Sequence, residues 1–262
     1  MLTQQEVKQH IKDLLSGVLR KKFQNYKPET NHMPFHTRLL GKDRMALYSF
    51  IHSLSTNFGS SIFEPVAKEL GRANFDRAEL QTKSGDKITL EAQEVIQDIM
   101  NCLETTANKP DKMHEMARIL EAVRGESRAN PITIKPTRVD LRLEKNQSVY
   151  LIDLKTAKPN VGEFKGFKRT LLTWMAAFAY DHPHITDIHT LIAIPYNPYA
   201  PKPYERWTLT GMLDLKCELM VGEDFWNFVG GEGSYAMLLE CFEEVGVQMR
   251  GEIDAYFKKF IN

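Results

Sequence analysis

Three charged residues stand at a spacing that could hold a metal ion beside a phosphate group. They are Asp140, Asp153 and Lys155. They lie in two stretches, 139–143 and 150–155, in which apolar residues recur at every second position. That period, broken by a polar run between the stretches, predicts a β-hairpin. A tight turn at Asn146 and Gln147 would place Asp140 directly opposite Asp153.

Two opposed carboxylates followed by a lysine suggest metal-assisted chemistry. Opposed residues point to one face with Cβ atoms about 4.5–5.5 Å apart, so Asp140 and Asp153 would repel unless a cation lay between them. Mg²⁺ typically binds one or two carboxylates with water and a substrate phosphate, and the backbone oxygen of Leu154 could add a ligand. Lys155 shares the face of Asp153, where it can hold the attacking water and the phosphate. We expect in-line phosphodiester hydrolysis that leaves a 5′-phosphate and a 3′-hydroxyl.

The alternative for these residues is a solvated strand edge, in which Asp-x-Lys carries ordinary surface charges. The spacing alone favours that alternative. Three further features favour catalysis: the expected register, the basic helix that follows, and the apolar neighbours of Asp153, among which a charge is costly unless it is used.

Glu64 is a fourth candidate for the catalytic site. It stands near the start of an expected helix, in the string Ser61-Ile62-Phe63-Glu64-Pro65. It could belong to a capping box or contribute to the metal site, and the local residues leave both roles open.

Basic residues gather just after the hairpin. Residues 153–169 hold five bases against two acids, a net charge of +3. From about 163 to 180 the apolar spacing predicts an amphipathic helix, and Lys165 and Lys168 lie off its apolar stripe. We therefore expect Lys158, Lys165 and Lys168 to contact the phosphate backbone of DNA.

A proline- and aromatic-rich run at 195–207 carries Lys202 and Arg206. It could pack on the core as an extended segment. Because proline fixes φ, the run could instead hold a basic side chain ready for DNA at little cost in entropy, and we favour that role. A planar guanidinium can bond O6 and N7 of guanine together. Arg206 is the first candidate for this contact and Arg38 the second.

The rest of the chain must supply the elements that position these groups. Helical spacing predominates over 1–130, and we expect a mainly helical region there. Within 131–210 the order is hairpin, helix and strand, with the strand parallel to the hairpin through a right-handed crossover. Residues 211–262 are expected to be helical and acidic, since 212–262 holds ten acids against four bases. A chain of 262 residues can bury one sizeable core, so we expect a single domain over 1–262.

Composition limits the classes of protein. Apolar content of 42% and charged content of 26% are ordinary for a globular chain, and no apolar run approaches the ~18 residues of a membrane span. The N-terminal residues resemble no secretion signal, so a cytoplasmic location without a membrane partner is expected. A net charge of zero argues against non-specific coating of nucleic acid. The three cysteines form no CxxC pair, which argues against a zinc site.

The order helix, Asp140, Asp153-Leu154-Lys155, helix, strand resembles the αββαβ core of PD-(D/E)XK nucleases, with Val139 where the motif's name has proline. A closer resemblance joins the chain to the TdeIII-type type II restriction endonucleases. It rests on the strings Pro34-Phe-His-Thr-Arg-Leu-Leu-Gly41, Ser61-Ile-Phe-Glu-Pro65, Ile152-Asp-Leu-Lys-Thr-Ala-Lys-Pro-Asn160 and Ile194-Pro-Tyr-Asn-Pro-Tyr199. The resemblance implies an α/β restriction-endonuclease-like fold with its catalytic core at 131–210. It also implies a metal-site role for Glu64.

The same resemblance implies cleavage of double-stranded DNA at GGNCC-type sites and a companion methyltransferase that acts on the same site without forming a stable complex. We expect a homodimer, since a two-fold protein places two single active sites on the two strands of a palindrome. The alternatives are a repair or junction-resolving nuclease on the same core, and a DNA-binding protein without catalysis.

Overall fold

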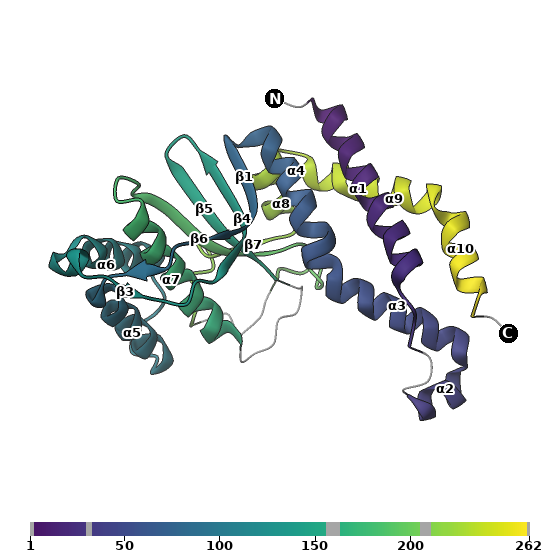
Figure 1. The fold of residues 1–262 in the computed structure, drawn as a ribbon, viewed down its shortest axis with the longest axis horizontal. Helices are drawn as coiled ribbons and strands as arrows, with labels where there is room; N and C mark the ends of the chain where they lie inside the picture. The colour runs from purple at the N-terminus through teal and green to yellow at the C-terminus, as the bar shows by residue number, and fades with distance from the viewer. Residues whose placement is uncertain (1–2, 30–32, 156–162, 205–210, 261–262) are drawn as a thin grey trace.

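The computed structural model describes residues 3–29, 33–155, 163–204 and 211–260, apart from the side chains of Asn57 and Ser127. Its centre is a mixed five-stranded sheet in the order β1-β4-β5-β6-β7, drawn in Figure 1. The strands are β1 (Arg77–Lys83), β4 (Arg138–Lys145), β5 (Ser148–Leu154), β6 (Asp187–Ile194) and β7 (Leu219–Val221). Two short strands, β2 (Lys87–Ile88) and β3 (Ile132–Thr133), form a separate antiparallel pair. The chain is therefore an α/β protein with a mixed sheet flanked by helices.

The expected hairpin, its turn and its register are confirmed. Strands β4 and β5 pair antiparallel, with Leu141 opposite Ile152 and Lys145 opposite Ser148. Asn146 adopts φ +58° in the turn, a left-handed conformation that asparagine tolerates and two-residue hairpin turns require. The expected helix and parallel strand are confirmed too, because α7 (Phe164–Asp181) lies between β5 and β6 in the chain and β6 pairs parallel with β5.

Helices cover both faces of the sheet and define two apolar cores. One core includes residues of α5 (Leu90–Glu104), α6 (Lys112–Arg124) and α7. The other includes residues of α1 (Gln4–Asn25), α4 (Glu64–Asn74), α8 (Glu223–Gly230) and α9 (Ser234–Gln248). Strand β5 serves both, because Val149 and Leu151 pack into the first core and Ile152 and Leu154 into the second. A strand buried on both faces is a rigid base for side chains at its end.

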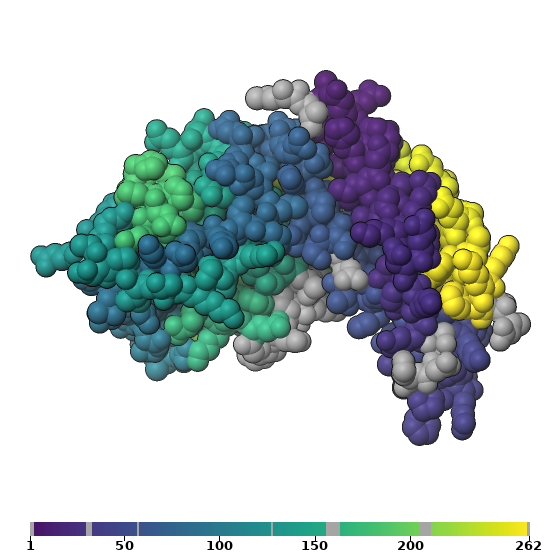
Figure 2. All heavy atoms as spheres, in the orientation of Figure 1, coloured from purple at the N-terminus to yellow at the C-terminus, as the bar shows by residue number. Residues whose placement is uncertain are grey.

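A helical arm extends from the second core, to which α4 belongs. It consists of α2 (Pro34–Leu40) and α3 (Lys42–Phe58), and a π-helical turn, η1 (Gly59–Phe63), joins α3 to α4 without a break. The last helix, α10 (Arg250–Lys258), lies against α3, where the rings of Phe50 and Tyr256 are 5.3 Å apart. Figures 1 and 2 show a curved molecule, with the sheet toward one side and the end of this arm projecting on the other.

Two strands of the sheet lie in regions that were expected to be mainly helical (1–130) or helical (211–262). β1 forms an edge of the sheet within the region 1–130, and β7 forms the other edge within 211–262. The sheet therefore extends beyond the core expected at 131–210. Apolar and polar residues do not alternate strictly in β1, so its pairing with β4 decides its conformation. A short 3-10 turn, η2 (Glu126–Ala129), precedes β3. Over the described residues, no helix is long and apolar enough to cross a membrane.

Candidate active site

The hairpin brings the expected carboxylates and lysine together at the end of β5. The ladder of β4 and β5 ends at the pair Leu141 and Ile152, and Asp140 and Asp153 are the next residue of each strand beyond it. Asp140 Oδ2 accepts a hydrogen bond from the backbone N–H of Leu154 at 2.9 Å. Lys155 Nζ lies 2.8 Å from Asp153 Oδ1. Local hairpin geometry thus builds the group that the spacing predicts.

Asp153 is an almost fully buried acid with a raised pKa. The residue is only 6% exposed. Its pKa is raised to about 7, because burial and the neighbouring carboxyl of Asp140 raise it by more than the attraction of Lys155 lowers it. A charge close to both carboxyls would relieve their repulsion. The attraction of Lys155 therefore offsets the burial of Asp153 only in part.

The oxygen donors of this group suit Mg²⁺ better than a softer metal. Asp140, Asp153 and the backbone oxygen of Leu154 are hard ligands, and Mg²⁺ typically takes one or two carboxylates with water and phosphate. Within the described ranges, no group of three or more His, Cys, Asp or Glu side chains is placed to hold a metal ion. A metal here would thus rely on two carboxylates, with water and substrate completing its shell.

Glu64 belongs to the same group of side chains. It lies on the first turn of α4, is 6% exposed, and accepts a hydrogen bond at Oε2 from Gln81 Nε2 at 2.7 Å. The same Gln81 nitrogen lies 3.1 Å from Asp140 Oδ1. Burial raises the pKa of Glu64, the Gln81 hydrogen bond lowers it, Asp140 raises it and Lys155 lowers it. No side-chain cap forms at the start of α4, because η1 continues directly into that helix. Of the two roles left open by the sequence, the structure shows no capping box and places Glu64 beside Asp140.

Gln81 is the residue of this group that sequence reasoning missed. It stands on β1 opposite Asp140, between Leu80 and Thr82, which pair with Leu141 and Val139. The sequence gives no sign of it, because the residue lies in a region expected to be mainly helical and its backbone adopts φ +54°. Only recognition of β1 as a strand beside β4 would have found it.

A cavity of about 920 Å³ opens beside the carboxylates. Glu64, Leu154 and Lys155 line it, together with Phe167 and Tyr196. Lys155 Nζ lies 4.7 Å from the centre of the Phe167 ring. The lysine therefore lies between the buried acid and a space that a substrate can enter.

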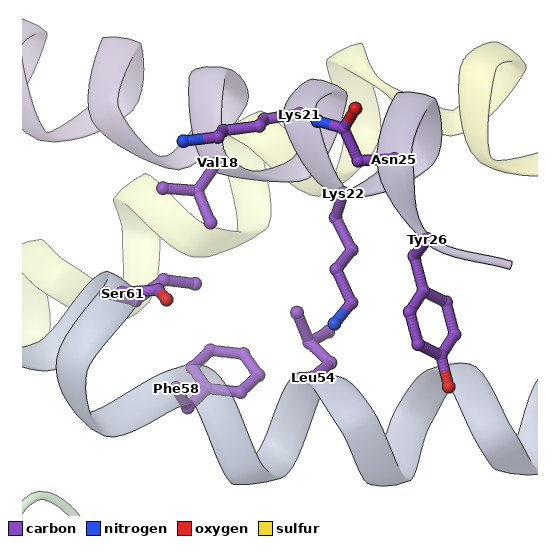
Figure 3. Close-up of a pocket in the computed structure, with 9 residues that line it drawn as sticks. Val18, Lys21, Lys22, Asn25, Tyr26, Leu54, Phe58 and Ser61 are labelled. Carbon is purple, nitrogen blue, oxygen red and sulfur yellow. The ribbon is translucent and has the colours of Figure 1, made fainter. Parts of the chain in front are cut away.

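A second cavity, of about 440 Å³, lies between α1 and α3. Figure 3 shows Lys22, Tyr26 and Phe58 among the side chains that line it. Lys22 Nζ donates to Ser53 Oγ at 2.5 Å. No acid is among its described lining residues, so this cavity lacks the chemistry found at the end of β5.

The expected DNA contacts fall into different surroundings. Lys165 is exposed on α7 with its Nζ 2.6 Å from Glu104 Oε2. Arg38 is exposed on α2, and Lys202 is exposed in the run after β6. Lys158 and Arg206 lie outside the described residues.

The expected orientation of Lys168 was wrong. Its side chain is fully buried, and its Nζ binds Glu115 and, at 2.6 Å, Glu218 Oε2. Lys112 Nζ reaches the same Glu218 at 2.9 Å and Thr190 Oγ1 at 2.6 Å. The apolar stripe of α7 marks the face toward the sheet, but α6 packs against the helix as well. A residue off the stripe is consequently buried, and Lys168 is not available to a DNA phosphate in this structure.

The fold and this site together define an α/β protein with a helix-flanked mixed sheet and a carboxylate–lysine group at the end of its central hairpin. The family model described as "Type II restriction endonuclease, HinfI" matches residues 3–246. The chain therefore belongs to the HinfI family of type II restriction endonucleases. The expected kinship with type II restriction endonucleases is confirmed, and the matching family model carries the HinfI name.

Individual relatives agree with this family. The chain is 27% identical over 243 residues to the type II restriction enzyme MjaII of Methanocaldococcus jannaschii, over 82% of this chain and 63% of the relative. It is 25% identical over 224 residues to the type II restriction enzyme HgiCII of Herpetosiphon aurantiacus, over 84% and 80%. For HgiEI of the same organism the values are 23% over 226 residues, 84% and 79%. The match thus spans less than two thirds of MjaII and about four fifths of the Herpetosiphon enzymes.

Proposed function

We propose that this chain is a Mg²⁺-dependent, site-specific deoxyribonuclease of the PD-(D/E)XK class. The observation that carries the proposal is the grouping at the end of one hairpin: Asp140 accepts a hydrogen bond from the N–H of Leu154, and Lys155 Nζ lies 2.8 Å from the buried Asp153. Membership of a type II restriction endonuclease family supports DNA as the substrate. The raised pKa of Asp153 supports a cation at the site.

Each residue of the site has a role in this proposal. Asp140, Asp153 and the backbone oxygen of Leu154 would hold Mg²⁺, with Glu64 adding negative charge beside Asp140. When bound, Mg²⁺ polarises the phosphoryl oxygens and lowers the pKa of a coordinated water. Lys155 holds the attacking water from the cavity side and stabilises the charge that develops on the phosphate. The products carry a 5′-phosphate and a 3′-hydroxyl.

We propose a GGNCC-type palindrome as the target, because the chain resembles TdeIII-type enzymes in four strings of sequence. A homodimer acting in the cytoplasm would place one site on each strand. A companion methyltransferase would protect the same sequence in the host. The exposed residues Lys165, Lys202 and Arg38 are proposed to contact DNA, together with Lys158 and Arg206. Lys168 is not included, because its side chain is buried.

Digestion of phage DNA by the purified protein with Mg²⁺ tests the proposal. Discrete bands that disappear with Asp153→Ala support a site-specific nuclease, and sequencing of the ends gives the target. Cutting confined to branched substrates would assign a junction-resolving nuclease instead. Sequence-specific binding without cutting at any Mg²⁺ concentration would assign a DNA-binding protein without catalysis.

A further inference from the structure

Gln81 interrupts β1 directly opposite Asp140. Its neighbours Leu80 and Thr82 pair with the residues on either side of Asp140. Its φ of +54° lies in the left-handed region, which residues with a Cβ rarely adopt. Such a backbone persists where surrounding contacts hold it, and it is concentrated at functional sites. Here it directs the side chain toward two carboxylates.

The amide of Gln81 joins α4 to the hairpin. Its Nε2 donates to Glu64 Oε2 at 2.7 Å and to Asp140 Oδ1 at 3.1 Å, and an NH₂ group carries the two hydrogens that this requires. The other oxygen of Asp140 accepts from the N–H of Leu154. Both oxygens of Asp140 are therefore fixed, one by β1 and one by β5.

The two acids of the site are held by different chemistry. Asp153 is held by the cation of Lys155 at 2.8 Å, whereas Asp140 is held by a neutral amide. A second lysine at position 81 would compete with a metal ion for Asp140, and a fourth acid there would add repulsion with Glu64. A glutamine orients both carboxylates without adding a charge of either sign.

We propose that Gln81 is a positioning residue of the metal site, which fixes the carboxylate of Asp140 and holds Glu64 beside it. The inference rests on the proposed function, in which Asp140 and Asp153 bind the metal. It follows that the left-handed backbone serves the site rather than the sheet. Partners that orient metal ligands typically contribute 10–100-fold in metal affinity or activity, and we expect an effect of about that size.

Two substitutions separate the side chain from the backbone. Gln81→Met keeps the length of the side chain and removes its hydrogen bonds. Gln81→Gly removes the side chain but adopts a positive φ without strain, so it should fold at least as well as the wild type. Gln24→Met, at an exposed position on α1, is the matched control.

The measurement is calorimetric titration of each protein with Mn²⁺ alone, without DNA. We expect both Gln81 variants to bind Mn²⁺ about 10–100-fold more weakly than the wild type and the Gln24 control. In cleavage assays the metal concentration for half-maximal rate should rise for both Gln81 variants and stay at the wild-type value for the Gln24 control. A purely structural glutamine would instead lower the melting temperature and leave metal affinity unchanged.

The outcomes separate this inference from the proposed function. If both Gln81 variants bind Mn²⁺ like the Gln24 control while Asp153→Ala does not bind it, the positioning role is wrong and the metal site stands. If Asp153→Ala binds Mn²⁺ like the wild type, the metal site is wrong and the inference fails with it. If the wild type cuts no DNA but its Mn²⁺ affinity depends on Gln81, the positioning role stands and nuclease activity fails.

Discussion

Lys155 Nζ lies 2.8 Å from Asp153 Oδ1, so the lysine at the end of β5 turns back to the acid two positions before it. The ammonium compensates the buried carboxylate only in part, because burial and Asp140 still raise the pKa of Asp153 to about 7. The chain therefore maintains an acid whose ionised form is unfavourable in the metal-free protein. Strongly shifted acids of this kind are concentrated at functional sites, and the proposed metal would offset the cost.

Asp153→Asn should stabilise the metal-free protein, and the effect should depend on pH. The pKa of Asp153 is higher in the folded chain than its ordinary value of 3.8, so the native state binds this proton more tightly than the unfolded state. The resulting stability is fully present below about pH 4 and is lost as the pH rises through about 7. Asparagine does not ionise, so the Asp153→Asn variant does not lose this stability as the pH rises. A gain of 1 kcal/mol would raise Tm by roughly 2–4 °C in a chain of this size.

Thermal melts in EDTA at pH 5 and pH 8 test this expectation. The gain from Asp153→Asn should be larger at pH 8, where the wild-type carboxyl is ionised, and excess Mg²⁺ should reduce it by stabilising the wild type alone. A variant that melts below the wild type at pH 8 would show that the Lys155 contact outweighs the burial of the acid.

Asp140→Ala and Asp153→Ala should each abolish cleavage, because either change removes one of two carboxylates proposed to bind the metal. Specific DNA binding measured in Ca²⁺ should persist, since the exposed basic residues are untouched. Single-turnover cleavage and gel-shift assays on the same duplex separate the two effects. Near-normal cutting by Asp153→Ala would reject the assigned site.

Lys155→Ala should reduce the rate while leaving metal binding measurable. Its charge lies between Asp153 and the cavity, where in the proposed mechanism it would act on the water and the scissile phosphate. Loss of one preorganised group of this kind typically lowers the rate by about 10²–10³-fold. Cleavage rates at saturating Mg²⁺, with Mn²⁺ titration as the control, measure the effect. An unfolded variant would instead identify Lys155 as a structural residue.

The part of the site that could be predicted from the sequence is the part whose residues lie close together along the chain. Asp140, Asp153 and Lys155 lie on one hairpin, and a period of two with a two-residue turn fixes their relation. Gln81 enters through an edge strand whose pairing is not encoded in its own seven residues, and its backbone departs from the strand conformation. Glu64 enters through the packing of α4. Those long-range relations carry no local signal.

The error on Lys168 has the same origin. Periodicity identifies the face of α7 that meets the sheet, but it does not show that α6 covers the helix from another side. Lysine is rarely buried unless it is paired, so an exposed basic helix was the simpler expectation. The buried pairs with Glu115 and Glu218 could be found only from the contact between the two helices.

Lys168→Met should destabilise the protein without a specific effect on DNA binding. Removing Lys168 takes away the buried ion-pair partner of Glu115 and leaves Glu218 with Lys112 alone; breaking a buried pair in this way typically costs about 3–5 kcal/mol. Lys165→Met, one turn away and exposed, should leave the free energy of unfolding almost unchanged. It should reduce the slope of log K for DNA binding against log salt concentration by about one. Urea unfolding and affinity measured across salt concentrations distinguish the two lysines. A flattened salt slope for a folded Lys168→Met would return that lysine to the DNA interface.

Arg206, or as a second choice Arg38, should bond guanine in the target sequence. A guanidinium can donate to O6 and N7 together, which a lysine cannot do, and Arg38 is exposed on the projecting α2. Each change to alanine should cost roughly 1–3 kcal/mol on the cognate duplex and much less on a scrambled duplex. Both affinities are measured at one fixed salt concentration, because phosphate contacts change with salt.

Equal losses on both duplexes would make the arginine a phosphate contact, and no loss on either would exclude it from the interface. A loss confined to the cognate duplex for Arg38→Ala would place the α2–α3 arm against the bases. A loss confined to it for Arg206→Ala would assign base recognition to the run that follows β6.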